Sequence, residues 1–183
     1  MPPLVFIPLL TSTTAPIKSY LSYTLPVVGA GWIIALTGLI DDVKELSAKK
    51  KMIGILLAAS LVWFLTDFRL NDFKIPFGGP LLHFEPWLSY LLTVIWIVAI
   101  TNAVNLIDGL DGLVSGVSII SLVTMGIVSY FFLPVPNLFL TMTIFVLVAS
   151  IAGFFPFNYH PAILYLGDTG ALFIGFMISV LSL

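Results

Sequence analysis

The sequence predicts an all-α protein, a polytopic bundle of transmembrane helices, from three observations. Of the 183 residues, 60% are hydrophobic and 9% are charged, whereas a soluble domain carries roughly 25% charged residues. Residues 113–167 contain no Asp, Glu, Lys or Arg. Several apolar runs approach the roughly 20 residues that a helix needs to cross a bilayer. Because backbone polar groups in lipid must be satisfied within the segment, we expect these runs to be helices and not strands.

Five apolar runs are expected to span the membrane, and a sixth run is shorter. The expected spans are residues 25–40, 52–66, 87–104, 113–133 and 138–157, followed by the short run 172–183. The first two runs flank a charged turn, so we expect them to form a helical hairpin. The chain shows no internal repeat and no soluble segment, which predicts a single membrane-embedded domain over residues 1–183.

Alternation of the spans predicts which loops lie on the same side of the membrane. Loops 41–51, 102–112 and 158–170 fall on one side, and loop 67–86 falls on the other. The shared side carries five aspartates, which are Asp41, Asp42, Asp108, Asp111 and Asp168. It also carries more lysines than the opposite side, so the positive-inside rule places these three loops in the cytoplasm.

The composition argues against two kinds of partner or site. The net charge of −2 disfavours binding to nucleic acid, because the phosphate backbone requires a basic patch. The chain contains no cysteine, which excludes disulfides and thiolate metal sites.

Loop 41–51 begins with adjacent carboxylates directly after an apolar run. Residues i and i+1 of a helix point about 100° apart, so Asp41 and Asp42 are expected to have different roles. Carboxylates at membrane depth are costly and are commonly functional. The alternative is a solvated turn in which Lys49 and Lys50 contact anionic lipid headgroups.

Loop 102–112 carries a polar side chain at every third position, namely Asn102, Asn105, Asp108 and Asp111. In an unbroken helix this spacing drifts about 60° at each step. Gly109 and Gly112 indicate instead that the helix loosens there, so that all four groups can face one cavity. The alternative is that Asp111 is only the N-cap of the next helix.

Loop 158–170 ends with Asp168 between two glycines at the expected start of a helix. A helix N-terminus offers amide donors to an anion, and an adjacent carboxylate suits Mg²⁺, which prefers oxygen ligands. The alternative for Asp168 is N-capping, and His160 is expected to be an interfacial histidine and not a ligand. Five clustered carboxylates repel one another unless a cation intervenes. The set therefore predicts a divalent metal and phosphoryl-type transfer onto a membrane-bound acceptor.

Three signatures in this order resemble those of the polyprenyl-phosphate N-acetylhexosamine-1-phosphate transferases, glycosyltransferase family 4. They are Asp41-Asp42 with Leu46-Ser47-Ala48 and Lys51, Asn102 and Asn105 with Asp108-Gly109-Leu110-Asp111-Gly112, and Asn158 with Pro161-Ala162 and Gly167-Asp168-Thr169-Gly170. Their spacing extends through residues 40–175, most of the chain. The resemblance is nearest to the undecaprenyl-phosphate GlcNAc-1-phosphate transferases, with the MraY translocases as more distant relatives.

The resemblance implies a reaction in which a lipid phosphate attacks the β-phosphate of a UDP-sugar. Its partners would be a UDP-N-acetylhexosamine, such as UDP-GlcNAc, and undecaprenyl or another polyprenyl phosphate, and UMP would be released. This would be the first membrane step of cell-wall or surface-polysaccharide synthesis. A homodimer is compatible with this expectation.

The resemblance also implies roles for nine residues. Asp168 would coordinate Mg²⁺, for which Mn²⁺ can substitute. The expected catalytic residues are Asp41, Asp42, Asp108 and Asp111, with Asp41 and Asp42 beside the lipid phosphate and one of them a candidate for its deprotonation. The expected substrate-binding residues are Lys51, Asn102, Asn105 and Asn158.

Two other interpretations remain open. Family members have further spans and a histidine-rich cytoplasmic loop, so we expect this chain to correspond to the middle of a longer transferase, or to an inactive truncated remnant of one. A cation transporter is the other alternative. A transporter should place acids in mid-span, whereas the interiors of the expected spans carry no charge.

Overall fold

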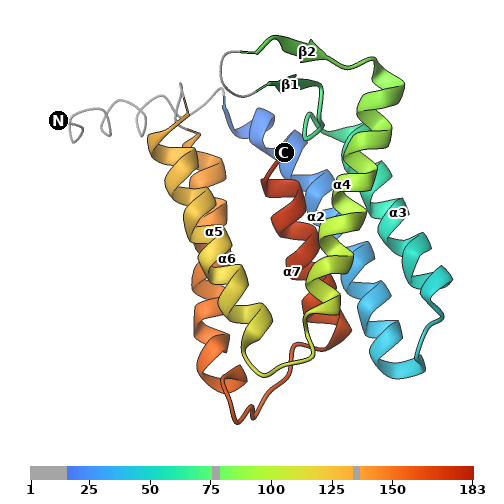
Figure 1. Ribbon diagram of the computed structural model, residues 1–183, viewed down its shortest axis with the longest axis vertical. Helices are drawn as coiled ribbons and strands as arrows, with labels where there is room; N and C mark the ends of the chain where they lie inside the picture. The colour runs from blue at the N-terminus through green and yellow to red at the C-terminus, as the bar shows by residue number, and fades with distance from the viewer. Residues whose placement is uncertain (1–15, 76–78, 134–136) are drawn as a thin grey trace.

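The computed structural model describes residues 16–75, 79–133 and 137–183, and within these ranges it consists of six helices and one short hairpin (Figure 1). The helices are α2 (Pro16–Lys44), α3 (Ala48–Leu65), α4 (Pro86–Leu106), α5 (Leu113–Phe131), α6 (Leu138–Asn158) and α7 (Gly167–Leu181). The strands are β1 (Asp72–Lys74) and β2 (Leu81–His83). Each expected span lies in a helix apart from one or two residues at its end, so the prediction of an all-α membrane bundle is confirmed.

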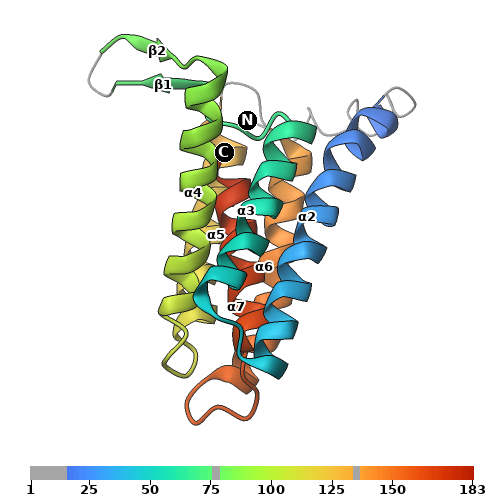
Figure 2. The same cartoon turned by 90° about the vertical axis from the view of Figure 1, so that its right-hand side faces the viewer.

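Four helical segments in the described part of the chain are long and apolar enough to cross a membrane. They are residues Thr24–Lys44 of α2 and the whole of α4, α5 and α6. The other two helices run beside them (Figures 1 and 2). α3 has 18 residues but begins with three lysines, and α7 has only 15 residues. The chain is therefore a multi-pass membrane protein.

Helix α7 lies at the centre of a group that also contains α2, α3 and α4. It packs along both α2 and α4, and α3 packs against the same two helices. Leu172, Phe176 and Val180 of α7 are fully buried there. The same core contains Ala30 and Ile34 of α2, Ile55, Ala58, Ala59 and Val62 of α3, and Val94 and Ile97 of α4. These neighbours shelter α7, which explains how so short an apolar helix can lie within the bundle.

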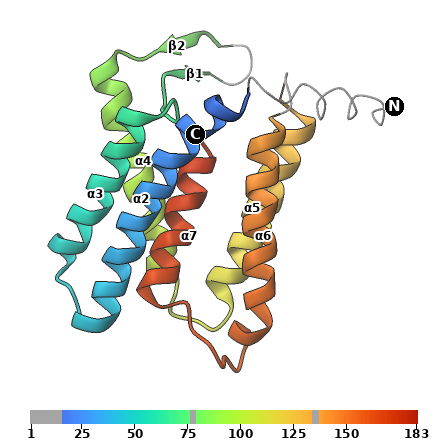
Figure 3. The same ribbon diagram turned by 180° about the vertical axis from the view of Figure 1, so that it is seen from behind.

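Helices α5 and α6 form a second unit that stands apart from this group (Figures 1 and 3). They pack closely on each other and reach the rest of the bundle through α7. Two buried side-chain hydrogen bonds join them, between Ser129 and Thr141 at 3.0 Å and between Ser115 and Asn158 at 2.7 Å. In an apolar medium such bonds hold helices together where the hydrophobic effect cannot.

The loop between α3 and α4 contains secondary structure that the sequence analysis missed. β1 and β2 pair antiparallel, with Asp72 opposite His83 and Phe73 opposite Leu82. Three residues per strand are too few to show a period-2 pattern in the sequence. The hairpin lies at the end of the bundle opposite to the three acidic loops (Figure 2).

The three acidic loops meet at one end of the bundle. The turns from α2 to α3, from α4 to α5 and from α6 to α7 all lie there (Figures 1 and 3). This confirms that alternation of the spans brings Asp41, Asp42, Asp108, Asp111 and Asp168 to a common face.

Single cysteines should report this common face, because the native chain contains none. We expect S47C, L110C and I163C to react with a membrane-impermeant maleimide from one side of sealed vesicles. Leu110 and Ile163 are 69% and 76% exposed, so the label can reach them. H83C, in the hairpin, should react only from the other side. Labelling of S47C and L110C from opposite sides would contradict the arrangement.

Candidate active site

The turn from α2 to α3 is organised by Asp41, which is 6% exposed. Its Oδ1 accepts a hydrogen bond from the backbone amide of Leu46 at 2.6 Å. Glu45 adopts a left-handed φ of 47° and its amide bonds to the carbonyl of Asp41 at 2.8 Å, which ends the helix. The carboxylate thus holds the turn that leads back into α3.

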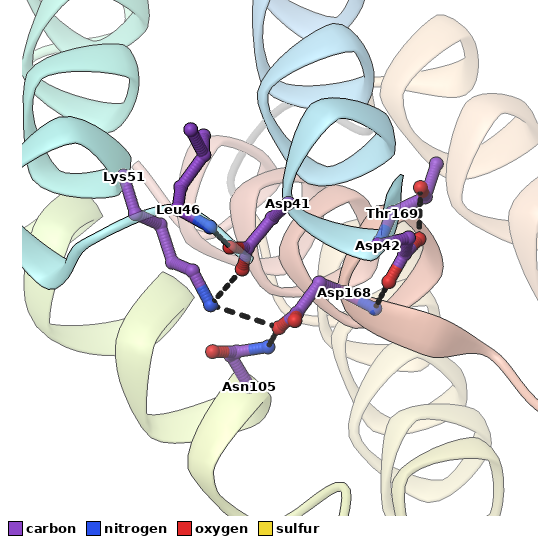
Figure 4. A network of polar contacts seen from close by, with 7 residues as sticks. All are labelled: Asp41, Asp42, Leu46, Lys51, Asn105, Asp168 and Thr169. Carbon is purple, nitrogen blue, oxygen red and sulfur yellow. Dashed lines mark hydrogen bonds and ion pairs between the residues drawn. The ribbon is translucent and has the colours of Figure 1, made fainter. Parts of the chain in front are cut away.

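Lys51, in the first turn of α3, connects two of the predicted acidic residues (Figure 4). Its ammonium group forms an ion pair with Oδ2 of Asp41 and lies 3.0 Å from Oδ1 of Asp168. The same Oδ1 accepts a hydrogen bond from the amide of Asn105. Ends of α2, α3, α4 and α7 are therefore joined by one network of four polar side chains.

Asp42 points away from this network and toward the start of α7 (Figure 4). Its carboxylate accepts hydrogen bonds from the backbone amides of Asp168 and Thr169 at 2.7 and 3.1 Å. The two adjacent aspartates therefore have different partners, as their positions on a helix predicted. The amides that were expected to be open to an anion instead bind the Asp42 carboxylate.

The polar residues of loop 102–112 separate into two groups. Helix α4 ends at Leu106, and α5 begins after Gly112, which adopts a φ of 72°. The prediction that the helix breaks near the glycines is confirmed. Asn105 joins the Lys51 network, whereas the amide of Asn102 donates to the carbonyl of Val98, one turn back, at 2.8 Å. The expectation that all four polar groups face one cavity was therefore wrong, because neither Asn102 nor Asn105 lines the pocket that Asp108 and Asp111 share.

Asp108 and Asp111 line a pocket of about 300 Å³ beside the network. The other lining residues are 109–110, Asn158 and 165–167. Burial, followed by the negative charges of Asp168 and Asp42, raises the pKa of Asp108 to about 6. The surrounding structure thus disfavours the ionised form of Asp108.

Asp111 fastens the loop that connects α6 to α7. Its Oδ2 accepts a hydrogen bond from the backbone amide of Ala162 at 3.1 Å and lies 2.9 Å from Nδ1 of His160. These two contacts, the Ala162 amide first, hold the pKa of Asp111 below its ordinary value. The N-cap of α5 is Gly112, so the alternative of a capping role for Asp111 was wrong.

Asn158 is buried at the end of α6 and both ends of its amide are bonded within the protein. Oδ1 accepts from the Ser115 hydroxyl at 2.7 Å, and Nδ2 donates to the carbonyl of Leu164 at 3.0 Å. Its observed contacts shape the pocket wall, and its substrate-binding role stays a prediction. Its partner Ser115 was not predicted, because nothing in the local pattern separates it from the other hydroxyl residues of α5.

The donor set fits an oxygen-preferring cation only in part. Asp108 and Asp168 repel each other, which a cation would relieve. Within the described ranges, however, no three His, Cys, Asp or Glu side chains form a group that could hold a metal. A Mg²⁺ ion here would need oxygens from water or phosphate as well, which is its usual mode of binding.

The fold and the site define a multi-pass membrane protein with an acidic, lysine-bridged centre at one end of its helix bundle. The chain belongs to glycosyl transferase family 4, whose family model matches residues 24–183.

Two kinds of relative are similar to the chain. A probable undecaprenyl-phosphate N-acetylglucosaminyl 1-phosphate transferase of Bacillus subtilis is 41% identical over 157 residues, covering 85% of this chain and 42% of the relative. A phospho-N-acetylmuramoyl-pentapeptide-transferase of Staphylococcus saprophyticus is 38% identical over 161 residues, covering 81% and 49%. The transferase of that name from Listeria innocua is 31% identical over 192 residues, covering 93% and 57%. The chain thus spans about half the length of these curated relatives.

The raised pKa of Asp108 predicts a pH-dependent gain in stability for Asp108→Asn. Folded Asp108 binds its proton more tightly than the unfolded chain, so its ionisation destabilises the fold as the pH rises from about 4 to 6. The variant should melt at a higher temperature than the native protein at pH 7.5, in detergent and without divalent cations. The difference should disappear near pH 4. An equal difference at both pH values would show that the effect is not electrostatic.

Proposed function

We propose that this chain carries the reaction centre of a transferase that moves an N-acetylhexosamine 1-phosphate from a UDP-sugar to undecaprenyl or another polyprenyl phosphate. The single observation that carries the proposal is the network of Asp41, Lys51, Asn105 and Asp168 beside the Asp108 pocket. A cationic amine among carboxylates at a membrane boundary suits a reaction between a soluble diphosphate and a lipid phosphate. The names of the relatives support the same class of reaction.

We propose GlcNAc 1-phosphate as the transferred group. The B. subtilis relative, 41% identical, is named for N-acetylglucosaminyl 1-phosphate transfer. The relatives named for phospho-N-acetylmuramoyl-pentapeptide transfer, at 38% and 31% identity, support the same type of phosphoryl transfer with a different sugar. A direct comparison of the two sugar nucleotides as donors distinguishes them.

The chemical step balances without a strong base. An oxygen of the lipid phosphate forms a bond to the β-phosphorus of the UDP-sugar, and the bond from that phosphorus to the bridging oxygen breaks as UMP leaves. A phosphate monoester is already partly ionised near neutral pH, so its deprotonation is a minor requirement. The larger requirement is neutralisation of the charge on the phosphates.

The residues of the centre would meet that requirement in different ways. The Lys51 ammonium group, fixed by Asp41 and Asp168, would attract a phosphate oxygen. Asn105 would orient the Asp168 carboxylate, since it already donates to it. Asp168, with the neighbouring carboxylate of Asp108, would hold Mg²⁺ or Mn²⁺, which supplies charge neutralisation and a template for the diphosphate.

We propose that the centre faces the cytoplasm. The end that carries the centre has four lysines, which are Lys44, Lys49, Lys50 and Lys51, whereas the hairpin end has three basic residues, which are Lys18, Arg69 and Lys74. This bias follows the positive-inside rule, and UDP-sugars are cytoplasmic substrates in the implied reaction.

The proposal predicts release of UMP from UDP-GlcNAc by membranes that contain the protein. Release should require both a polyprenyl phosphate and Mg²⁺ or Mn²⁺, and EDTA should abolish it. Asp168→Asn should lower the rate about 100-fold or more, because an electrostatic group at the reacting phosphates is lost.

The matched control is Asp72→Asn, which removes a carboxylate that pairs with His83 at the opposite end of the bundle. It should leave the rate at the native value. If Asp168→Asn also kept the native rate, the assignment of Asp168 to the metal would be wrong. If UMP were released without a lipid phosphate, polyprenyl phosphate would not be the acceptor.

A further inference from the structure

The carboxylate of Asp42 caps the N-terminus of α7, although Asp42 belongs to another helix. Oδ1 accepts from the amide of Asp168 at 2.7 Å, and Oδ2 accepts from the amide of Thr169 at 3.1 Å and from its hydroxyl at 2.5 Å. The first amides of a helix have no partner inside the helix. Asp42 provides that partner from the last turn of α2, 126 residues earlier in the chain.

Helix α7 has no such acceptor of its own. The residue before its first turn is Leu166, which makes no side-chain capping bond, and Gly167 enters the helix with a φ of 62°. A negative charge at this end is also favoured by the helix dipole. The start of α7 therefore depends on α2 for both hydrogen bonding and charge.

The backbones of α2 and α7 approach closely at Gly38, and Gly167 lies tightly against the Asp42 side chain. A Cβ added at Gly38 would lie 2.5 Å from Cα of Thr169, a backbone atom that cannot rotate away. A Cβ at Gly167 would lie 3.0 Å from both oxygens of the Asp42 carboxylate. Gly38 and Asp42 are four residues apart on α2 and so lie on the same face. The close approach of α2 to α7 and the capping of α7 thus occur at the same contact between the two helices.

This contact fixes the residue that the proposed function places at the metal. The amide of Asp168 is held by Asp42 while its side chain accepts from Lys51 and Asn105. A shift of the first turn of α7 would therefore move the Asp168 carboxylate away from both donors.

We propose that Asp42 is a positioning residue, which caps α7 across the helix boundary and thereby sets the place of Asp168 in the reaction centre. It acts through α7 and is not the base that deprotonates the lipid phosphate. The effect of Asp42 on catalysis rests on the proposed function. Its role as the cap of α7 rests on the geometry alone.

The decisive comparison is Asp42→Asn against Asp42→Ala. Asn keeps one of the two oxygens that accept hydrogen bonds from α7, whereas Ala keeps neither, and Asn cannot act as a carboxylate base. Asp42→Ala should lower the rate of UMP release about 100-fold, the size of effect that a misplaced catalytic group produces. Asp42→Asn should stay within about fivefold of the native rate.

Hydrogen exchange provides a readout that needs no activity. In the full chain without substrates, the amides of Asp168 and Thr169 should exchange at least about tenfold faster in Asp42→Ala than in the native protein. In Asp42→Asn, whose side chain keeps one acceptor oxygen, one of the two amides should remain protected. Gly38→Ala should expose the same amides and cause the same loss of activity. Gly29→Ala is its matched control, because a Cβ at that position of α2 meets nothing within 4 Å.

Two results would overturn the proposal. One is native protection of both amides in Asp42→Ala, which would show that Asp42 does not hold α7. The other is an Asn variant as inactive as the Ala variant although one of the two amides stays protected, which would mean that the charge itself acts in the reaction. If the native protein released no UMP from any donor, the proposed function would fail, while the exchange comparison would still decide whether Asp42 is the cap.

Discussion

The ion pair of Lys51 with Asp41 and Asp168 is the interaction on which the arrangement of this protein depends. Charges at a membrane boundary are costly unless they are paired, and Asp41 is 6% exposed. The pairing requires that α2, α3 and α7 end at the same place, and Asn105 adds α4 through the shared Asp168 oxygen. Pairing these charges therefore requires the ends of the four helices to meet at one place.

The rest of the bundle is organised around this point by α7. Its apolar side chains fill the core between α2, α3 and α4, and its first turn lies under Asp42. The pair α5 and α6 is tied to the site end by polar contacts, with Asp111 holding the loop before α7 and Asn158 joining Ser115 to Leu164. Hydrophobic packing places the helices, and hydrogen bonds select the register in which their ends meet.

The sequence predicted what depends on local pattern and missed what depends on distant partners. Apolar runs and their alternation were enough to place five aspartates on one face, and glycines were enough to predict the break after Leu106. The partner of Asp42 could not be predicted, because a cap supplied from 126 residues away leaves no local signal. Asn102 and Asn105 look equivalent in a three-residue pattern, and only the end of α4 at Leu106 separates their roles.

The acids of the face differ in how the fold compensates their charge, and this difference argues for where a cation would act. Asp41 and Asp168 form ion pairs with Lys51. Asp42 accepts hydrogen bonds from backbone amides of α7. Asp111 accepts a hydrogen bond from the Ala162 amide and contacts His160. Asp108 has no ion-pair partner among the described residues, and its pKa is raised to about 6 by burial and by two neighbouring carboxylates. The fold thus compensates the charge of four carboxylates and leaves that of Asp108 uncompensated beside a pocket. A cation or other ligand that compensated this charge would gain binding free energy there. Under the proposed function, that ligand would be the metal with its diphosphate, bound at the pocket beside Asp108.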